Sequence, residues 1–347
     1  MIRLDKYATY AIKEEDADLR LDRWLQITCP LLSVHRRQKA IRLGDVRVNG
    51  KKAAPSLRLQ KGDRVSVFRK LLLLHEEALT LKEEGSALPK DFPSLSSLIL
   101  CETKDFIALN KPAGYATQGG TGLKVDLLSA LSKQRGEKLY MVHRLDKDTS
   151  GVWVVARNRS FATLFSTMLQ QGLVKKTYVA LLKGHLSKEA IAEGSYASYL
   201  LKEAKGSREN VVSYATEKKG AKKAVTAFQV MAQQKDLKTN DTLFYMRFMP
   251  LTGRTHQLRV HAQALGAPIV GDKRYGPSLK GVRKKPALCL HAQTLCFQTE
   301  KATSSILLDA PMPDAFQGCL KDYGFDLDDL KVKLATPKRG HKQNKNG

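Results

Sequence analysis

Apolar residues recur at helical spacing in two stretches near the start of the chain. Leu21, Trp24 and Leu25 form the first set, and the second lies within residues 33–43, which end at Gly44. Residues three and four positions apart share one face of an α-helix, and a glycine commonly follows the last turn. The pattern therefore predicts two short helices, the second of which carries several basic side chains.

Two strands are predicted to follow these helices. Residues 45–51 run through an Asn-Gly pair, which is a strong signal for a hairpin turn. Residues 64–67 alternate polar and apolar side chains and form the second expected strand. These elements together define a small basic module over residues 18–70, preceded by an N-terminal extension over residues 1–17.

The rest of the chain mixes short apolar runs with helical segments. Residues 71–96 lack periodicity and contain prolines and serines, so we expect a linker there. A helix is predicted from residue 160 to about residue 171, where the apolar residues share one face, and residues 253–261 open a second one. Periodicity alone supports a mixed α and β domain over residues 97–325, followed by a basic tail, 326–347, that we expect to be disordered. The expected strands are residues 99–100, 106–109, 139–142, 152–156, 176–182, 227–231 and 244–248.

The charge balance indicates a polyanionic partner. The 347 residues include 59 Lys and Arg against 34 Asp and Glu, a net charge of +25 with a pI near 9.8. Self-repulsion on this scale does not stabilise a fold, and the charge is spread through folded segments rather than placed on one amphipathic helix. Nucleic acid is therefore favoured over a membrane surface. The lysine-rich residues 202–224 are expected to form an extended loop or hairpin that contacts phosphates.

Cysteine usage and the N-terminal sequence favour a reducing compartment. The five cysteines form no CxxC pair, which is typical of free thiols. Residues 1–16 lack the apolar core of a secretory signal, and they contain acidic residues, unlike a mitochondrial presequence. The aliphatic run Leu71–Leu74 is far too short to cross a bilayer. We therefore expect a cytoplasmic, monomeric protein with no membrane partner.

The strongest chemical signal is the run from Met141 to Gly151, which reads MVHRLDKDTSG. Asp146 lies there on a turn between two short apolar segments, both expected to be buried strands. A carboxylate in such a place is costly unless it is paired or used in chemistry. Local physics leaves two interpretations open. Asp146 either caps its own turn through the amides of Asp148 or Thr149, or it takes part in a reaction.

Candidate phosphate-binding, metal-binding and glycosidase motifs each lack a residue or spacing that their function requires. The glycines at 114 and 119 are followed by Gly-Thr, whereas a phosphate-binding P-loop needs Lys and then Ser or Thr. His256 and His261 are five residues apart, so on a helix they point about 140° apart and cannot share a metal. A glycosidase needs a second acid, and Asp148 is tied to the same turn as Asp146. We therefore expect neither a metal nor a cofactor.

What remains is one carboxylate with arginines elsewhere in the sequence. Arg144 stands two residues before Asp146, and Arg254 and Arg259 lie further along the chain. A guanidinium can hold a carboxylate by two parallel hydrogen bonds and keep it ionised away from water. An ionised aspartate aimed at a nucleic acid favours nucleophilic or glycosidic chemistry.

Several of these segments resemble the RluA family of pseudouridine synthases. The central match is HRLDxxTSG at residues 143–151. The two N-terminal helices and the hairpin resemble the S4-type RNA-binding domain. With the glycine-rich loop at residues 119–122, this makes the chain most similar to the RluC branch, which acts on large-subunit (23S) ribosomal RNA. Further matches, in the family's order and covering roughly residues 98–315, are NKPAG at 110–114, KKTYVA at 175–180, GRTHQLRVH at 253–261, GDxxYG at 271–276 and LHA at 290–292.

The resemblance implies a fold and a set of residue roles. The implied fold is α+β, with a mainly antiparallel mixed sheet, flanking helices and a central cleft, beside the small S4-like domain. Asp146 would be the catalytic aspartate, held and ionised by a salt bridge from Arg259. Tyr178 would stack on the target base and assist removal of the C5 proton, and Arg144 would replace a uridine flipped out of its helix. The residues expected to bind RNA are Arg144, Arg36, Arg37, Lys39, Arg42, Arg254 and His256.

Two alternatives to this interpretation stay open. A non-catalytic RNA-binding or ribosome-assembly factor would use the same charge and the same S4-like module. Such a factor has no need of Asp146, Tyr178 and Arg259 as a set, which favours an enzyme. Within the enzyme class, transfer RNA is the alternative to ribosomal RNA or a pre-ribosomal particle.

Overall fold

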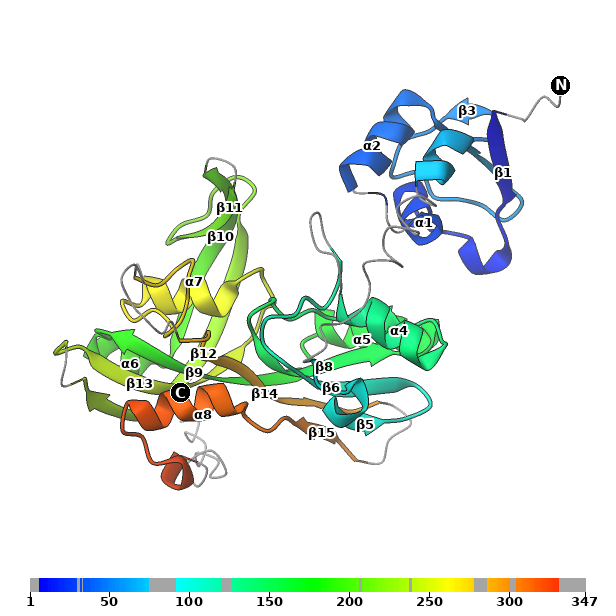
Figure 1. Ribbon diagram of the computed structural model, residues 1–347. Coiled ribbons are helices and arrows are strands. Elements are labelled where there is room, and N and C mark those ends of the chain that lie inside the picture. The colour runs from blue at the N-terminus through cyan, green and yellow to red at the C-terminus, as the bar shows by residue number, and fades with distance from the viewer. Residues whose placement is uncertain are drawn as a thin grey trace, which may run out of the picture. The chain divides into compact units, whose positions relative to one another are not determined.

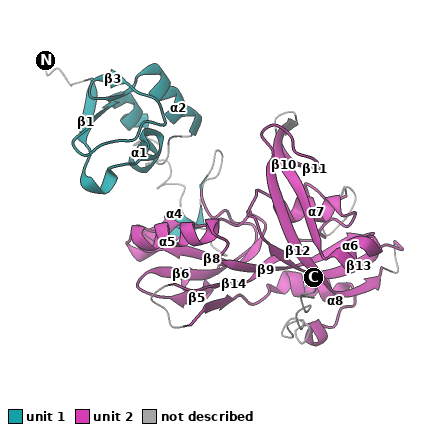
Figure 2. Cartoon of the chain, turned by 180° about the vertical axis from the view of Figure 1, so that it is seen from behind, with its two compact units in different colours: residues 1–92, 119–130 teal, residues 93–118, 131–347 magenta. Residues whose placement is uncertain are grey.

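The computed structural model describes residues 6–29, 32, 34–74, 92–119, 126–205, 208–236, 239–277, 286–299 and 304–330. The chain forms two units, one of residues 1–92 and 119–130 and the other of residues 93–118 and 131–347 (Figure 2). Much of the expected linker, the glycine-rich loop beyond Gly119 and most of the basic tail lie outside the described residues.

The described part of the first unit contains a four-stranded sheet and the helices α1 (Leu21–Thr28) and α2 (Val34–Leu43), preceded by the short 3-10 helix η1 (Glu14–Asp16). Residues 69–74 are also helical. They bury Leu21, Leu25 and Ile41 in one core with Val65 and Val67, as the helical and alternating patterns predict. The sheet has the order β1-β4-β2-β3, with β1 (Tyr7–Ala11), β2 (Val46–Val48), β3 (Lys51–Lys52) and β4 (Arg64–Phe68).

Strand β1 lies in the stretch that was expected to be a separate extension. It pairs antiparallel with β4, from Tyr7 opposite Phe68 to Ala11 opposite Arg64. Because β1 is an edge strand with partly buried or exposed side chains, it lacks the hydrophobic alternation of a buried strand. Residues 7–11 therefore share the sheet of the first unit.

The second unit is built on an eleven-stranded sheet (Figure 1). Its order is β11-β10-β12-β13-β9-β14-β8-β6-β5, with β15 paired to β14 and β7 paired to β8. Among the described strands only β8 and β14 pair in parallel, so the predicted α+β fold with a mainly antiparallel mixed sheet is confirmed. The strands are β5 (Ile99–Glu102), β6 (Phe106–Lys111), β7 (Tyr140–Met141), β8 (Ser150–Ala156), β9 (Lys175–Gly184), β10 (Ser195–Lys205), β11 (Arg208–Tyr214), β12 (Lys222–Lys235), β13 (Thr242–Pro250), β14 (Leu290–Phe297) and β15 (Ile306–Asp309).

Helices flank this sheet. Helix α5 packs on β7 and β8, whereas α7 contacts β11 and β12. Helix α5 begins where the Asn158 side chain accepts a hydrogen bond from the Phe161 amide at 2.8 Å, and it buries Phe161, Phe165 and Met168, as predicted. Among the described residues, the further helices with full bounds are η2 (Leu95–Leu98), α4 (Leu127–Arg135), α5 (Arg159–Gln170), α6 (Lys188–Glu193), α7 (Gln257–Ala264) and α8 (Asp314–Asp322).

The lysine-rich residues 202–224 form a hairpin and the start of a third strand. Strands β10 and β11 pair from Tyr199 opposite Tyr214 to Lys205 opposite Arg208. Strand β12 then pairs with the other edge of β10. Of the two forms expected for this stretch, an extended loop or a hairpin, the structure contains the hairpin.

The parallel contact between β8 and β14 depends on a glycine. Gly151 lies opposite Ala292, and its backbone has φ +112°. A Cβ atom at this position would lie 2.2 Å from the Ala292 carbonyl oxygen, so only glycine permits the approach. The segment that carries Asp146 therefore continues directly into a strand held between β6 and β14.

Three histidines of the second unit are buried and uncharged. Burial lowers the pKa of His143 to about 3, that of His261 to about 4, and that of His291 below its ordinary value. His143 accepts a hydrogen bond at Nε2 from the Val154 amide at 2.9 Å, which requires an unprotonated nitrogen. These rings are therefore structural parts of the fold in their neutral form.

Acidification should destabilise the protein through these rings. Below the ordinary histidine pKa of about 6.5 the unfolded chain binds protons that the folded chain does not, so the unfolded state is favoured. The pKa of His143 in the folded protein is about 3. Its neutral ring therefore has no effect on the pH dependence of stability above pH 6.5, and below that pH the free energy of unfolding falls by about 1.4 kcal/mol per pH unit until pH 3. Urea unfolding at pH values between about 7 and 5 measures this slope. The variant His143→Gln, which can still accept from Val154, should show a shallower slope, and an unchanged slope would contradict the assignment.

Candidate active site

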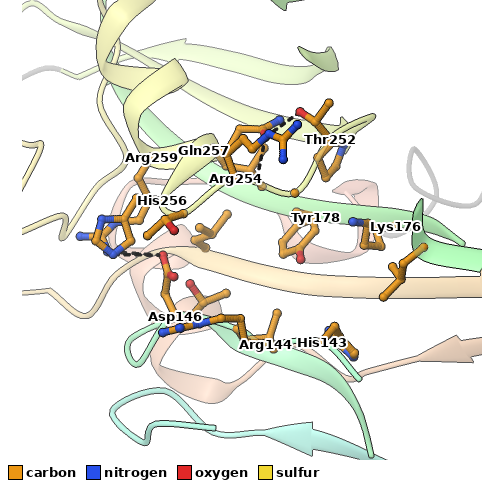
Figure 3. Close-up of a pocket in the computed structure, with 18 of the residues that line it drawn as sticks. His143, Arg144, Asp146, Lys176, Tyr178, Thr252, Arg254, His256, Gln257 and Arg259 are labelled. Carbon is orange, nitrogen blue, oxygen red and sulfur yellow. Dashed lines mark hydrogen bonds and ion pairs between the residues drawn. The ribbon is translucent and has the colours of Figure 1, made fainter. Parts of the chain in front are cut away.

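A cleft of about 600 Å³ crosses the second unit beside the Asp146 turn (Figure 3). Its lining comes from segments far apart in sequence: the Asp146 turn, the end of α5, strand β9, and the stretch from the end of β13 into α7. The three residues predicted to be catalytic, Asp146, Tyr178 and Arg259, all line it. The structure therefore brings the predicted set together.

The Asp146 turn is closed by its backbone, not by its carboxylate. The carbonyl oxygen of Asp146 accepts a hydrogen bond from the Thr149 amide at 3.1 Å. The carboxylate instead lies 3.6 Å from Arg259 Nη1 and 3.8 Å from His256 Nε2, both measured to Oδ2. Its side chain is 20% exposed. Of the two interpretations left open by the sequence, the one in which Asp146 caps its own turn does not match this geometry.

A buried lysine anchors the same turn. Lys111 is fully buried, and its ammonium group donates to the carbonyl oxygens of Pro112, Tyr115 and Lys147 at 2.8, 2.8 and 3.0 Å. Burial lowers the pKa of Lys111 to about 7, but three carbonyl acceptors for three N–H groups favour the charged form. The lysine thus ties the residue after Asp146 to the end of β6. Sequence reasoning identified this segment only as part of a motif.

Arg259 lies between two carboxylates: the expected ion pair with Asp146 is present, and a second, closer pair is formed with Asp272. It donates from Nε and Nη2 to the two oxygens of Asp272 at 2.7 and 2.8 Å, whereas its contact with Asp146 is a single ion pair at 3.6 Å. A guanidinium has five N–H groups, so it can bind two carboxylates at once. Nε and Nη2 form the bidentate pair with Asp272, and Nη1 faces Asp146. Arg259 is therefore fixed by Asp272, and Asp146 is its second, looser partner.

Asp272 is the residue of this cluster that sequence reasoning missed. Its side chain is fully buried, and it also accepts from the amides of Arg274 and Tyr275 at 2.9 Å each. Burial would raise the pKa of Asp272, but the hydrogen bonds and charge of Arg259 together with the two amides lower it overall. The available signal was the GDxxYG motif at residues 271–276.

Tyr178 projects into the cleft from β9 (Figure 3). Its neighbours across the sheet are Phe248 on β13 and Ala292 on β14. Burial and then the charge of Asp146 raise the pKa of Tyr178 above its ordinary value, so the phenol stays neutral. The site therefore offers an uncharged aromatic ring beside a carboxylate.

The residues expected to bind RNA occupy three different environments. Arg144, Arg254 and His256 line the cleft. In the first unit Arg36, Lys39 and Arg42 are exposed on α2. Arg37 does not fit the expectation: it is 7% exposed and its guanidinium donates to the Leu32 carbonyl oxygen. Its position in α2 faces inward with Ala40 and Ile41, so the run of basic residues is not one continuous surface.

Lys176 is a further cleft residue that sequence reasoning did not select. It stands two residues before Tyr178 on β9, so both side chains share one face of the strand (Figure 3). Burial lowers the pKa of Lys176. Among the described residues no carboxylate forms an ion pair with it. An amine in this position is a ready site for an anionic part of a ligand.

Metal-binding clusters and membrane-spanning helices are both missing from the described residues. Within the described part of the chain, no group of three or more His, Cys, Asp or Glu residues is arranged to hold a metal ion. No helix among those residues is both long and apolar enough to span a membrane.

Comparison with known proteins gives two family matches. RNA pseudouridylate synthase matches residues 105–264, and the S4 domain matches residues 19–65. A curated Rickettsia felis protein named ribosomal large subunit pseudouridine synthase C is 35% identical, covering 86% of this chain and 94% of its own. The protein of the same name in Salmonella typhimurium is 33% identical over 90% of this chain and 95% of its own.

Solved structures agree with this match. The human RNA pseudouridylate synthase domain containing 1 has a TM-score of 0.51 at 26% identity, covering 69% of this chain and 95% of its own. The human RNA pseudouridylate synthase domain containing 4 has a TM-score of 0.52 at 24% identity, covering 67% of this chain and 95% of its own. This second structure shows a similarity of fold.

The two family matches fall mainly in different units of the structure. The S4 match falls within the first unit, and the larger match contains Asp146, Tyr178 and Arg259. Relatives more than 30% identical over most of both chains share a family, and the resemblance found in the sequence motifs is confirmed. The chain belongs to the pseudouridine synthases, enzymes that act on RNA.

Proposed function

We propose that this enzyme isomerises uridines of large-subunit ribosomal RNA and that Asp146 is its catalytic carboxylate. The observation that carries the proposal is the position of Asp146, which projects into the cleft with Oδ2 facing Arg259 and His256. The relatives in Rickettsia and Salmonella are named for the large ribosomal subunit, which supports that substrate class. The S4 match in the first unit supports an RNA substrate with structure beyond the target nucleotide.

The reaction needs an ionised carboxylate but no redox partner. The bond between ribose C1′ and uracil N1 breaks, the uracil turns, and C1′ joins C5. The C5 proton leaves and N1 gains a proton, so atoms and electrons balance within the nucleotide. Asp146 would attack the ribose, attack the base or remove a ribose proton, and each role uses a free carboxylate oxygen.

Tyr178 would hold the uracil. Single bases flipped from a helix are commonly stacked on aromatic side chains, and its ring lines the same cleft as Asp146 (Figure 3). Because burial raises the pKa of Tyr178, the phenol keeps its own proton and is poorly suited to accept the C5 proton. Stacking is therefore the role we assign to it, ahead of the expected assistance in proton removal.

Basic residues would supply the binding energy for base flipping. Extruding a base costs a few kcal/mol. Arg144 is exposed on the Asp146 turn, where it would fill the gap left in the RNA helix. Contacts of phosphates with Arg36, Lys39 and Arg42 of α2 would offset the remaining cost.

Release of tritium tests this function. Uridine carrying tritium at C5 loses it to water when C5 becomes bonded to ribose. We expect release from large-subunit ribosomal RNA and none from transfer RNA. Release from transfer RNA alone would change the substrate class. Tight binding of both RNAs without release from either would leave only an RNA-binding factor.

Salt dependence of binding should separate Lys176 from its neighbour Lys175. We expect Lys176→Met to weaken RNA binding and to reduce the slope of log Kd against log salt by about 1, because one phosphate contact is lost. Lys175 is the matched control, since it is exposed on the opposite face of β9 and donates to the Gly172 carbonyl oxygen at 3.1 Å. Lys175→Met should leave the slope unchanged. Equal effects of the two variants would assign Lys176 no specific contact.

A further inference from the structure

His256 has an unusual backbone conformation at the edge of the cleft. It is the residue before α7, and it has φ +53° and ψ +20°, in the left-handed region. Residues other than glycine seldom adopt this conformation, and those that do often lie at functional sites, where surrounding contacts hold them. In His256 the imidazole makes two such contacts, one on each ring nitrogen.

The hydrogen bonds of Tyr275 determine which nitrogen of His256 carries the proton. The Tyr275 hydroxyl oxygen accepts from the Val211 amide at 3.3 Å and lies 2.7 Å from His256 Nδ1. The Arg274 side chain also donates to this oxygen, and both hydrogen bonds lower the pKa of Tyr275, against the larger effect of burial. Because both acceptor positions of the oxygen are then used, the hydroxyl donates its own proton to Nδ1. In the neutral ring the remaining proton is then on Nε2, the atom 3.8 Å from Asp146 Oδ2. Burial lowers the pKa of His256, against the opposing effect of Asp146, and this agrees with a neutral ring.

Tyr275 also contacts the second neighbour of Asp146. The guanidinium carbon of Arg259 lies 5.1 Å from the centre of the Tyr275 ring. The backbone amide of Tyr275 is in turn held by Asp272 at 2.9 Å. One tyrosine therefore touches both groups that face Asp146, and it is fixed by the same buried carboxylate that fixes Arg259.

Both contacts of the Asp146 carboxylate are with the same oxygen. His256 Nε2 and Arg259 Nη1 each approach Oδ2, and within the described part of the chain no hydrogen bond or ion pair to Oδ1 occurs. A carboxylate held through one oxygen presents the other in a defined direction.

We propose that Tyr275 and His256 are positioning residues, which direct an N–H to Oδ2 of Asp146 and so leave Oδ1 as the oxygen that reacts. The inference rests on the proposed catalytic role of Asp146 and assigns new roles to the two residues behind it. His256, expected from sequence to contact RNA, acts here on the enzyme's own carboxylate. Tyr275 acts on Asp146 only through His256 and Arg259.

The test removes a single hydroxyl. Tyr275→Phe keeps the ring that packs on Arg259 but takes away the donor to His256, so we expect kcat to fall about tenfold or more with KM unchanged. Tyr245→Phe is the matched control, because the Tyr245 hydroxyl is also buried in the second unit and has no hydrogen-bond partner among the described residues. Its kcat should equal that of the wild type. Thermal unfolding of both variants monitors folding.

A double-mutant cycle then shows whether Tyr275 works through His256. His256→Asn keeps a residue that tolerates the left-handed backbone but cannot reach Asp146 in the same way. The double variant should be no slower than His256→Asn alone, because the hydroxyl has nothing left to orient. An unchanged kcat in His256→Asn, or independent multiplication of the two effects, would overturn the proposal even if Tyr275→Phe folds poorly. A wild type that releases no tritium would instead defeat the proposed function.

Discussion

Replacing Asp146 with asparagine should remove turnover while leaving the fold and the RNA affinity nearly unchanged. An amide has the size of the carboxylate but is neither a useful nucleophile nor a base, so every proposed role of Asp146 is lost. We expect activity to fall by at least about a thousandfold, which corresponds to roughly 4 kcal/mol of transition-state stabilisation.

The small effect on stability follows from the contacts of Asp146. The side chain is 20% exposed, and its ion pairs with Arg259 and His256 are long, at 3.6 and 3.8 Å. Loss of the Asp146 charge leaves no buried cation unpaired, because Arg259 keeps its bidentate partner Asp272. The measurements are tritium release, RNA binding and thermal unfolding of the same preparation. Asp148→Asn, in the same turn, is the control and should retain most of the activity; turnover by Asp146→Asn would remove Asp146 from the chemistry.

Replacing Asp272 with asparagine should cost about 3–5 kcal/mol of unfolding free energy, because it leaves the Arg259 guanidinium buried without its bidentate partner. The side chain of Arg259 is 8% exposed and that of Asp272 is fully buried, so water cannot take the place of the lost carboxylate. Arg259→Ala should destabilise by a similar amount, since it leaves Asp272 ionised and buried with only two amides as donors.

Urea unfolding of three variants distinguishes the two partners of Arg259. If Asp272 is the structural partner, Asp272→Asn and Arg259→Ala are strongly destabilised, whereas Asp146→Asn is not. The double variant Arg259→Met/Asp272→Leu should be less damaged than the sum of its parts, because no unpaired charge remains. Equal destabilisation by Asp146→Asn and Asp272→Asn would mean that Arg259 depends on both carboxylates for folding.

Local patterns predicted the elements that bury one clear face. The helices α1, α2 and α5 and the strands β6, β8, β9 and β13 follow from apolar spacing, because each contributes a continuous apolar face to a core. Strand β1 was missed because it is an edge strand with little burial. The position of β14 between β8 and β9 depends on pairing between segments far apart, which no local pattern contains.

The residues of the candidate site also fall into those that local sequence could predict and those that only the fold reveals. Asp146, Tyr178 and Arg259 could be named because their motifs carry the resemblance, and the structure places them around one cleft. The closer partner of Arg259 could not, because an isolated Asp272 looks like any aspartate in a turn until the fold brings it to the guanidinium. Arg37 was misassigned for the opposite reason: a basic residue was taken as exposed, although its place on α2 faces the core.

The position of β14 in the sheet affects how the protein folds during translation. Asp146 and Tyr178 are made near the middle of synthesis, but the strand that joins their halves of the sheet, Leu290–Phe297, is made near the end. Pairing between such distant segments must wait until both exist, so the nascent chain carries its reacting groups without the complete sheet while roughly the next third of its residues is added. Catalytic competence therefore waits for the C-terminal part of the polypeptide that contains β14.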